Sequence, residues 1–169
     1  FWDGIREAIQ LLMPPSGELL QIVGLSLLVS ASATLLAGLL AAPFGAWLAL
    51  HEFRFKRQII TLMNTAMAIP AVLIGLLVYM TLSRRGILGY LGLLFTPGAM
   101  IAAQALLAFP IVAVLTLAAL KNAARDYKDL ALSLGASRVQ LAFLVIRQGR
   151  FAFLTALISA FSRVIGETG

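Results

Sequence analysis

A chain of 169 residues that is 61% hydrophobic and only 12% charged differs strongly from soluble domains, which are about 45–50% apolar and about 25% charged. The formal net charge of +6 does not by itself predict nucleic-acid binding, because basic residues in the loops of a membrane protein set its topology. The absence of cysteine excludes disulfides and thiolate metal sites.

The apolar runs are continuous rather than alternating, which predicts transmembrane helices. We therefore expect an all-α integral membrane protein, with about four transmembrane helices in a single domain over residues 1–169. The last apolar run, 151–165, would be about 22 Å long as a helix and is short for a hydrocarbon core of about 30 Å. The domain is accordingly expected to be incomplete at its C-terminus, with five membrane helices in the full chain.

The first segment, 1–13, places its apolar residues on one face and is expected to be an interfacial helix. The first membrane helix is predicted over 19–50. Small residues recur there at every fourth position, which favours close approach of another helix: Ser26, Ser30, Thr34, Gly38, Ala42 and Ala46.

Three further membrane helices are predicted over 59–82, 99–120 and about 150–169. The connection before the third of the four carries Gly86, Gly89 and Gly92. No strand precedes this glycine repeat, so it is interpreted as a close-packed turn and not as a nucleotide-binding loop.

The distribution of basic residues predicts the orientation. Nine Lys and Arg residues fall in 51–58 and 121–150, whereas the other side has Arg6, Arg84 and Arg85. Cytoplasmic loops are enriched in Lys and Arg, so both basic segments are expected in the cytoplasm and the N-terminus outside.

The polar section 121–149 is predicted to form a helix, an elbow and a second helix. Asp126 is a candidate N-cap, Gly135 a left-handed stop, and Ser137 with Gln140 a capping box. The first of these helices has one apolar face, made of Tyr127, Leu130, Ala131 and Leu134. So short a helix needs a packing partner, which the pattern leaves open among lipid headgroups, the loop 51–58 and a cytoplasmic subunit.

The segment "DLALSLGASRVQLAFLVI" resembles the cytoplasmic signature of permease subunits of ATP-binding-cassette (ABC) importers. That signature reads Glu-Ala-Ala, three residues, Gly, and an apolar stretch ending in Leu-Pro. Asp129 stands at the glutamate, Leu130 and Ala131 at the alanines and Gly135 at the glycine, whereas 147–148 are Arg-Gln. The segments 64–89, 94–112 and 161–169 are similar to parts of tungstate-type permeases, which are related to molybdate and sulfate permeases.

This resemblance implies a type I ABC importer permease fold in a multi-pass protein of a bacterial or archaeal inner membrane. It implies a pathway for an oxyanion, tungstate first, with molybdate or sulfate as alternatives. The implied partners are a second permease copy, a cytoplasmic ABC ATPase dimer, an external oxyanion-binding protein and membrane lipid, with no nucleic acid. The short cytoplasmic helix would be a coupling helix contacting the ATPase through Asp129, Leu130, Ala131, Leu134, Gly135, Ala136, Ser137 and Arg138.

No cofactor is expected in this chain. It has no G-x-x-x-x-G-K-[ST] motif, so ATP and Mg²⁺ are expected on the partner ATPase. A metal site is not expected at the single histidine, His51, which has no second ligand at helical spacing.

Polar residues and prolines inside the spans are candidates for the translocation pathway or its gate: Asn64, Pro70, Gln104, Pro110, Arg163 and Glu167. Arg163 and Glu167 are four residues apart and can pair on one helix face. The alternative is that this pair holds helices together or lies at the outer interface, and that the proline kinks serve packing.

Two other classes of protein remain as alternatives. A self-contained channel or secondary carrier would need ion-coupling carboxylates within its spans, where Glu167 alone qualifies. A small intramembrane enzyme is disfavoured because the chain has few groups from which a catalytic constellation could be assembled.

Overall fold

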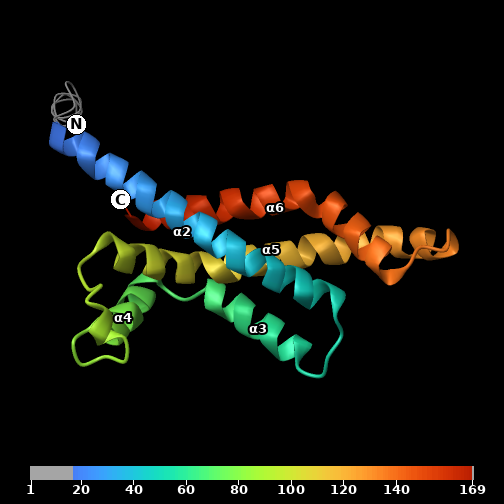
Figure 1. Ribbon diagram of the computed structural model, residues 1–169, viewed down its shortest axis with the longest axis horizontal. Coiled ribbons are helices and arrows are strands. Elements are labelled where there is room, and N and C mark those ends of the chain that lie inside the picture. The colour runs from blue at the N-terminus through green and yellow to red at the C-terminus, as the bar shows by residue number, and fades with distance from the viewer. Residues whose placement is uncertain (1–16, 169) are drawn as a thin grey trace, which may run out of the picture.

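The computed structural model describes residues 17–168, apart from the side chains of Glu18, Lys128, Asp129, Leu132, Arg138, Ala142 and Thr168. The interfacial helix predicted at 1–13 lies outside the described residues. The described part is helical, without strands: α2 (Gly17–Leu50), α3 (Lys56–Met67), α4 (Ala71–Leu82), the 3₁₀ turn η1 (Gly89–Leu91), α5 (Pro97–Ser133) and α6 (Arg138–Thr168) (Figure 1). The all-α fold class is confirmed.

The helices α2, α5 and α6 pack lengthwise around a core of small residues. Ala37 and Ala41 of α2 meet Ala108 of α5 and Ala160 of α6, and all four side chains are at most 1% exposed. Alanine and glycine let helix backbones approach closely, which is how helices associate in lipid. The predicted close packing of α2 is confirmed at Gly38, which lies against α6.

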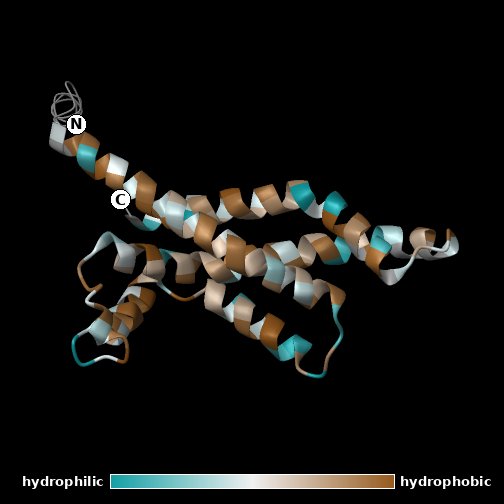
Figure 2. Ribbon diagram, viewed as in Figure 1, coloured by the Kyte–Doolittle hydropathy of each residue, from teal (hydrophilic) through white to brown (hydrophobic). Residues whose placement is uncertain are grey.

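The outward surface is apolar. Leu28, Leu35 and Leu39 of α2 are 57%, 67% and 73% exposed, a pattern suited to contact with lipid. Three helices, α2, α5 and α6, are long and apolar enough to cross a membrane, or up to four spans if α3 and α4 are taken as one. Figure 2 shows hydrophobic residues along these helices and hydrophilic ones gathered in the connections before α3 and after α4.

The span predicted over 59–82 is not one continuous helix. It is divided into α3 and α4, whose axes are bent by 103° at a short break. The break falls at Pro70, which has an extended ψ of 136° and is the N-cap of α4. Proline has no backbone N–H and disfavours the helical conformation at the preceding residue, here Ile69, so the helix stops and restarts.

The prediction that Asp126 caps a separate coupling helix is wrong. The third predicted span, 99–120, and the polar residues after it form one helix, α5, which runs without a break from Pro97 to Ser133. Residues 121–133 contain no glycine or proline and are rich in alanine, leucine, lysine and arginine, so nothing ends the helix before Gly135. The last helix likewise begins earlier than predicted, at Arg138.

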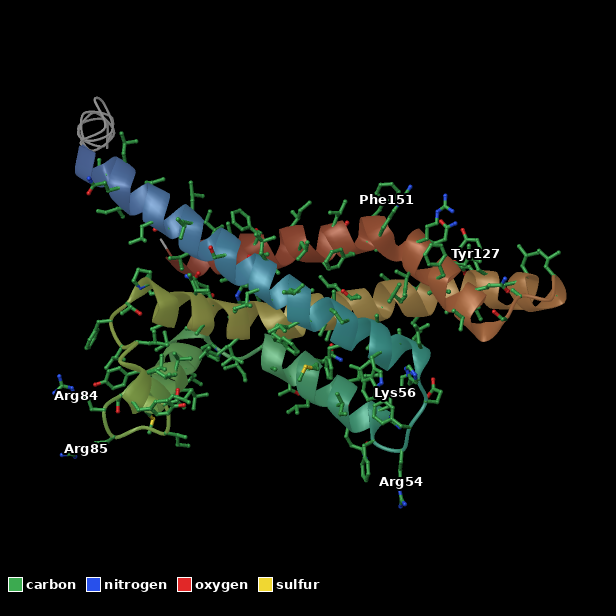
Figure 3. All side chains as sticks on the ribbon, viewed as in Figure 1. Arg54, Lys56, Arg84, Arg85, Tyr127 and Phe151 are labelled. Atoms are coloured by element: carbon green, nitrogen blue, oxygen red, sulfur yellow. The ribbon has the colours of Figure 1, made fainter. Side chains whose placement is uncertain are left out.

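The two basic segments lie toward one end of the molecule. Lys56 pairs with Glu52 at 2.8 Å, and Lys121 of α5 lines the same small depression. Figure 3 shows Arg84 and Arg85 at the opposite end of the long axis from Tyr127, with Lys56 between them on the Tyr127 side. This is the arrangement that the predicted orientation requires.

Candidate functional site

The elbow between α5 and α6 is formed by a left-handed glycine. Gly135 has a φ of +76°, and the N–H of Ala136 donates to the carbonyl of Ala131 at 2.9 Å. This bond spans five residues and satisfies a carbonyl that the end of α5 would otherwise leave without a partner. The stop predicted at Gly135 is thus confirmed.

The first turn of α6 is closed by the predicted capping box, which is also confirmed. The N–H of Ser137 donates to Gln140 Oε1 at 2.8 Å, and the N–H of Gln140 donates to Ser137 Oγ at 3.3 Å. Two backbone donors at the helix start are satisfied reciprocally. The start of α6 is therefore encoded by local sequence.

Four large apolar side chains lie exposed on the two sides of this elbow. Leu130 and Leu134 are 59% and 79% exposed, and Val139 and Phe143 of α6 are 79% and 69% exposed. We call these four residues the elbow patch. Figure 1 shows that the elbow projects beyond the end of α2, so α2 does not cover it. Because this segment is predicted to lie in the cytoplasm and not in lipid, these exposed apolar side chains are candidates for an interaction surface.

Of the predicted apolar face of the coupling segment, part packs inside the protein and part is exposed. Ala131 is 6% exposed and Tyr127 is half-buried, whereas Leu130 and Leu134 project outward. The sequence analysis does not single out Val139 and Phe143, although their spacing of four residues at the start of α6 is a usable signal. Asp129 and Arg138 lie within α5 and α6, but their side chains are outside the described set.

Within the membrane helices, Arg163 and Glu167 pair as their spacing predicted. Arg163 Nε lies 3.2 Å from Glu167 Oε1, and each side chain is 39% exposed. The Nε–H does not point at the carboxylate with hydrogen-bond geometry, and this atom is buried. The pair is a charge contact in which the buried Nε–H has no hydrogen-bond acceptor among the described residues.

Further buried polar atoms have no hydrogen-bond partner within the described part of the chain: Thr34 Oγ1, Gln104 Oε1 and Thr116 Oγ1. Unsatisfied polar atoms are costly in hydrocarbon and point to a partner outside the chain, such as water, a substrate or another subunit.

Gln104 and Arg163 lie at about the same depth. Gly149 of α6 faces Leu120 of α5, and the two helices run in opposite directions. Gln104 precedes Leu120 by about 24 Å along α5, and Arg163 follows Gly149 by about 21 Å along α6, at about 1.5 Å per residue. A carbonyl oxygen and a guanidinium donor, both without hydrogen-bond partners in the described chain, are therefore level within about one helical turn.

No contact in the described part of the chain brings the other pathway candidates, Asn64, Pro70 and Pro110, to Gln104 or Arg163. The side chain of Asn64 is exposed on α3 and donates to the carbonyl of Ile60 at 3.0 Å. Pro70 forms the α3–α4 break, and Pro110 is buried inside α5. Among the side chains that the structure describes, no three His, Asp or Glu residues gather as metal ligands would.

Sequence comparison identifies the family. The family described as "Binding-protein-dependent transport system inner membrane component" matches residues 35–169. The chain belongs to this family. This inner membrane component is a subunit of an ABC transporter, which implies an external binding protein and an ATPase as partners, and a multi-pass location in the cell membrane.

Three relatives of this permease are informative. It is 38% identical to the tungstate uptake system permease protein TupB of Peptoclostridium acidaminophilum, over 99% of this chain and 73% of the relative. It is 34% identical to TupB of Campylobacter jejuni, over 99% of this chain and 70% of that one. It is 37% identical to a protein of Haloferax volcanii named "Probable anion ABC transporter permease protein", over 89% of this chain and 65% of the relative. All three are named as transport permeases.

Proposed function

We propose that this permease forms the membrane pathway of an importer for tungstate. The observation that carries the proposal is its similarity to two tungstate uptake permeases, each over 99% of the chain. The third relative is named for anion transport, which supports the wider class of oxyanions. Molybdate and sulfate, which have the same tetrahedral shape and charge, are the alternative substrates.

In this proposal the elbow patch is where ATP hydrolysis is coupled to transport. Leu134 and Val139 present apolar surface on either side of the elbow, and such surface fits a groove in a cytoplasmic ATPase subunit. ATP and Mg²⁺ are bound by that partner. Closure of an ATPase dimer would then move the elbow and, through the unbroken helices α5 and α6, their membrane segments.

The anion would cross between two permease copies, near the level of Gln104 and Arg163. The partly exposed Arg163 guanidinium suits an oxyanion, while the Glu167 carboxylate limits how tightly the anion is held. A pathway that binds its ion weakly lets it leave, so selectivity would rest mainly on the binding protein.

The test is reconstitution of the full-length permease with its ATPase in liposomes containing ATP. Tungstate and the binding protein are added outside, and internal tungsten is measured by mass spectrometry. We expect uptake with internal ATP, and none with ADP or with an ATPase whose phosphate-binding lysine is replaced. Uptake without ATP would contradict the proposal and favour a self-contained carrier. Competition by molybdate and by sulfate ranks the substrates.

A further inference from the structure

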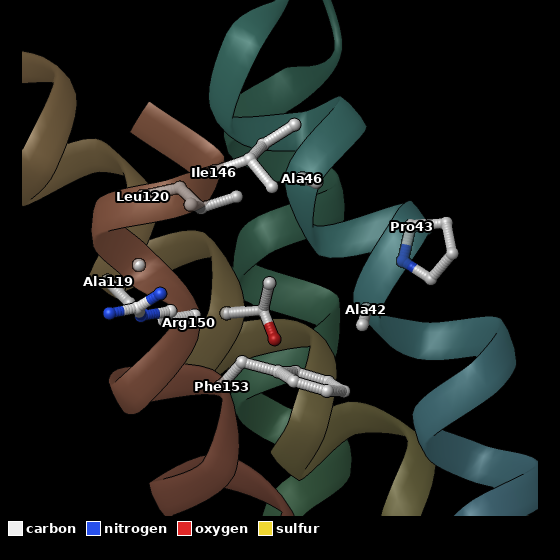
Figure 4. Close-up of a pocket in the computed structure, with 10 residues that line it drawn as sticks. Ala42, Pro43, Ala46, Ala119, Leu120, Ile146, Arg150 and Phe153 are labelled. Atoms are coloured by element: carbon white, nitrogen blue, oxygen red, sulfur yellow. The ribbon is translucent and has the colours of Figure 1, made fainter. Parts of the chain in front are cut away.

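A groove lies between α2, α5 and α6 on the side of the molecule assigned to the cytoplasm. Its volume is about 340 Å³. Figure 4 shows Arg150 at its edge, with α2, α5 and α6 each contributing to the walls. The lining residues used below are Pro43, Ala46, Thr116, Leu120, Arg150 and Phe153.

The depth of this groove can be read from where charge begins on each helix. α2 ends at Leu50, the first charge after the apolar part of α5 is Lys121, and the apolar run of α6 begins directly after Arg150. Trp47 packs against Phe53 with ring centroids 4.9 Å apart, and tryptophan marks membrane interfaces. The groove therefore starts at the interface and runs one to two helical turns into the cytoplasmic leaflet.

The chemistry of the groove changes along its length. The guanidinium of Arg150 lies 4.7 Å from the centroid of the Phe151 ring and has no acidic partner among the described residues. Thr116 is 5% exposed, and its hydroxyl has no hydrogen-bond partner there either. The other walls are apolar. A cation at headgroup depth, one hydroxyl below it and an apolar channel deeper still match the parts of a phospholipid in order.

We propose that this groove binds one anionic phospholipid. Its phosphate pairs with Arg150, Thr116 donates to a glycerol or ester oxygen, and an acyl chain lies along Ala46 and Phe153. The transported anion is a poor occupant, because a desolvated oxyanion needs more donors than these walls offer. A helix from a second permease copy is the other possible occupant, and the test below distinguishes it from lipid.

The test uses the full-length permease–ATPase complex and native mass spectrometry. After delipidation, the complex is titrated with 1-palmitoyl-2-oleoyl phosphatidylglycerol and, separately, with the phosphatidylcholine of the same chains. We expect one tightly bound phosphatidylglycerol per permease copy. Arg150→Gln should weaken its binding by about fivefold, the effect of one basic residue near a lipid surface. Ala46→Phe, which fills the groove, should abolish it.

Arg147→Gln is the matched control, because Arg147 is an exposed arginine one turn earlier on α6 that does not line the groove. We expect it to bind lipid as the wild type does.

Equal lipid retention by the wild type, Arg150→Gln and Ala46→Phe would overturn the proposal. So would a wild type that binds no lipid. If Ala46→Phe then separates the two permease copies, the groove is a subunit interface. Thermal unfolding of each variant identifies loss of folding, and Arg150→Gln, at an exposed site, keeps the test decisive if Ala46→Phe unfolds.

Discussion

Ser137 and Gln140 cap each other across the first turn of α6. Ser137 N–H donates to Gln140 Oε1 at 2.8 Å, and Gln140 N–H donates to Ser137 Oγ at 3.3 Å. Both residues are exposed, so this reciprocal pair, and not burial, holds the start of α6. The geometry of the proposed coupling surface thus depends on a few hydrogen bonds made by polar residues at its centre.

Replacing the cap should loosen the elbow without unfolding the protein. Ser137→Ala removes the Oγ acceptor and is expected to cost about 1 kcal/mol of local stability. The measurement is hydrogen–deuterium exchange at the Gln140 amide, which should speed up. Ser133→Ala is the matched control, because Ser133 Oγ only donates to its own helix, to the carbonyl of Leu130 at 2.8 Å. Equal acceleration in both variants would contradict a specific capping role.

Gly135 should tolerate asparagine and not valine. Its φ of +76° costs a non-glycine residue about 1–2 kcal/mol, more for a β-branched one, while asparagine adopts this conformation more readily. A Cβ at this position would meet nothing within 4 Å, so any difference arises in the backbone and not from a clash. Gly135→Val is expected to lose ATPase co-purification and uptake, and Gly135→Asn to retain both. Full activity of Gly135→Val would mean that the elbow does not transmit the coupling.

Glu52 gives the cytoplasmic end a measurable pH response. The hydrogen bond and charge of Lys56, and more weakly the charge of Lys121, lower the pKa of Glu52 below its ordinary value. Stability from a lowered carboxyl pKa is present above the unfolded-state pKa and is lost as pH falls through the folded-state pKa. Because Glu52 is exposed, water screens the pair and the effect on stability is small.

In Lys56→Gln, the pKa of Glu52 should rise toward the ordinary value, as measured by ¹³C NMR of labelled glutamate carboxyls. Lys121→Gln should raise it less, because Lys121 contributes only a weaker, through-space effect. A Glu52 pKa that is the same in the wild type and in Lys56→Gln would show that the ion pair is absent in solution.

Sequence patterns were reliable where a single residue decides the local structure. Gly135 and the Ser137–Gln140 box act within a few residues, so the stop and restart of the helix could be predicted. The prediction of an N-cap at Asp126 was wrong because no residue before it ends the preceding helix. An N-cap needs a preceding break, and nothing in 121–133 breaks α5. A kink at Pro70 could be predicted, but not a full break of the helix, because hydropathy continues across Pro70 while the backbone does not.

The proposed sites were harder to predict because they depend on contacts between distant segments. Gln104 and Arg163 lie at a similar depth because Gly149 of α6 packs against Leu120 of α5. No periodicity in the sequence reveals this contact. The groove at Arg150 likewise requires three helices at a fixed depth.

Two glycines of α2 should respond in opposite ways to alanine. A Cβ on Gly45 would lie 2.5 Å from the backbone oxygen of Ala113, so α2 and α5 must move apart. We expect Gly45→Ala to cost about 1–3 kcal/mol, as overpacking does. Gly24→Ala meets nothing within 4 Å and should stabilise the helix by up to about 1 kcal/mol. Thermal unfolding in detergent measures both, and a stable Gly45→Ala would rule out the close α2–α5 contact.

Arg163 and Glu167 can be assigned to the pathway or to packing by opposite effects of two neutral variants. In the pathway, Arg163→Gln removes the donor that meets the anion and should reduce tungstate uptake several-fold. Glu167→Gln removes the competing carboxylate and leaves Arg163 to the anion, so uptake should saturate at a lower tungstate concentration. If the pair only holds helices together, either variant removes the same 3.2 Å contact. Both variants should then lower thermal stability and leave the tungstate concentration at half-maximal uptake unchanged. Uptake measured against tungstate concentration in proteoliposomes, with unfolding temperatures of the same preparations, separates the two roles.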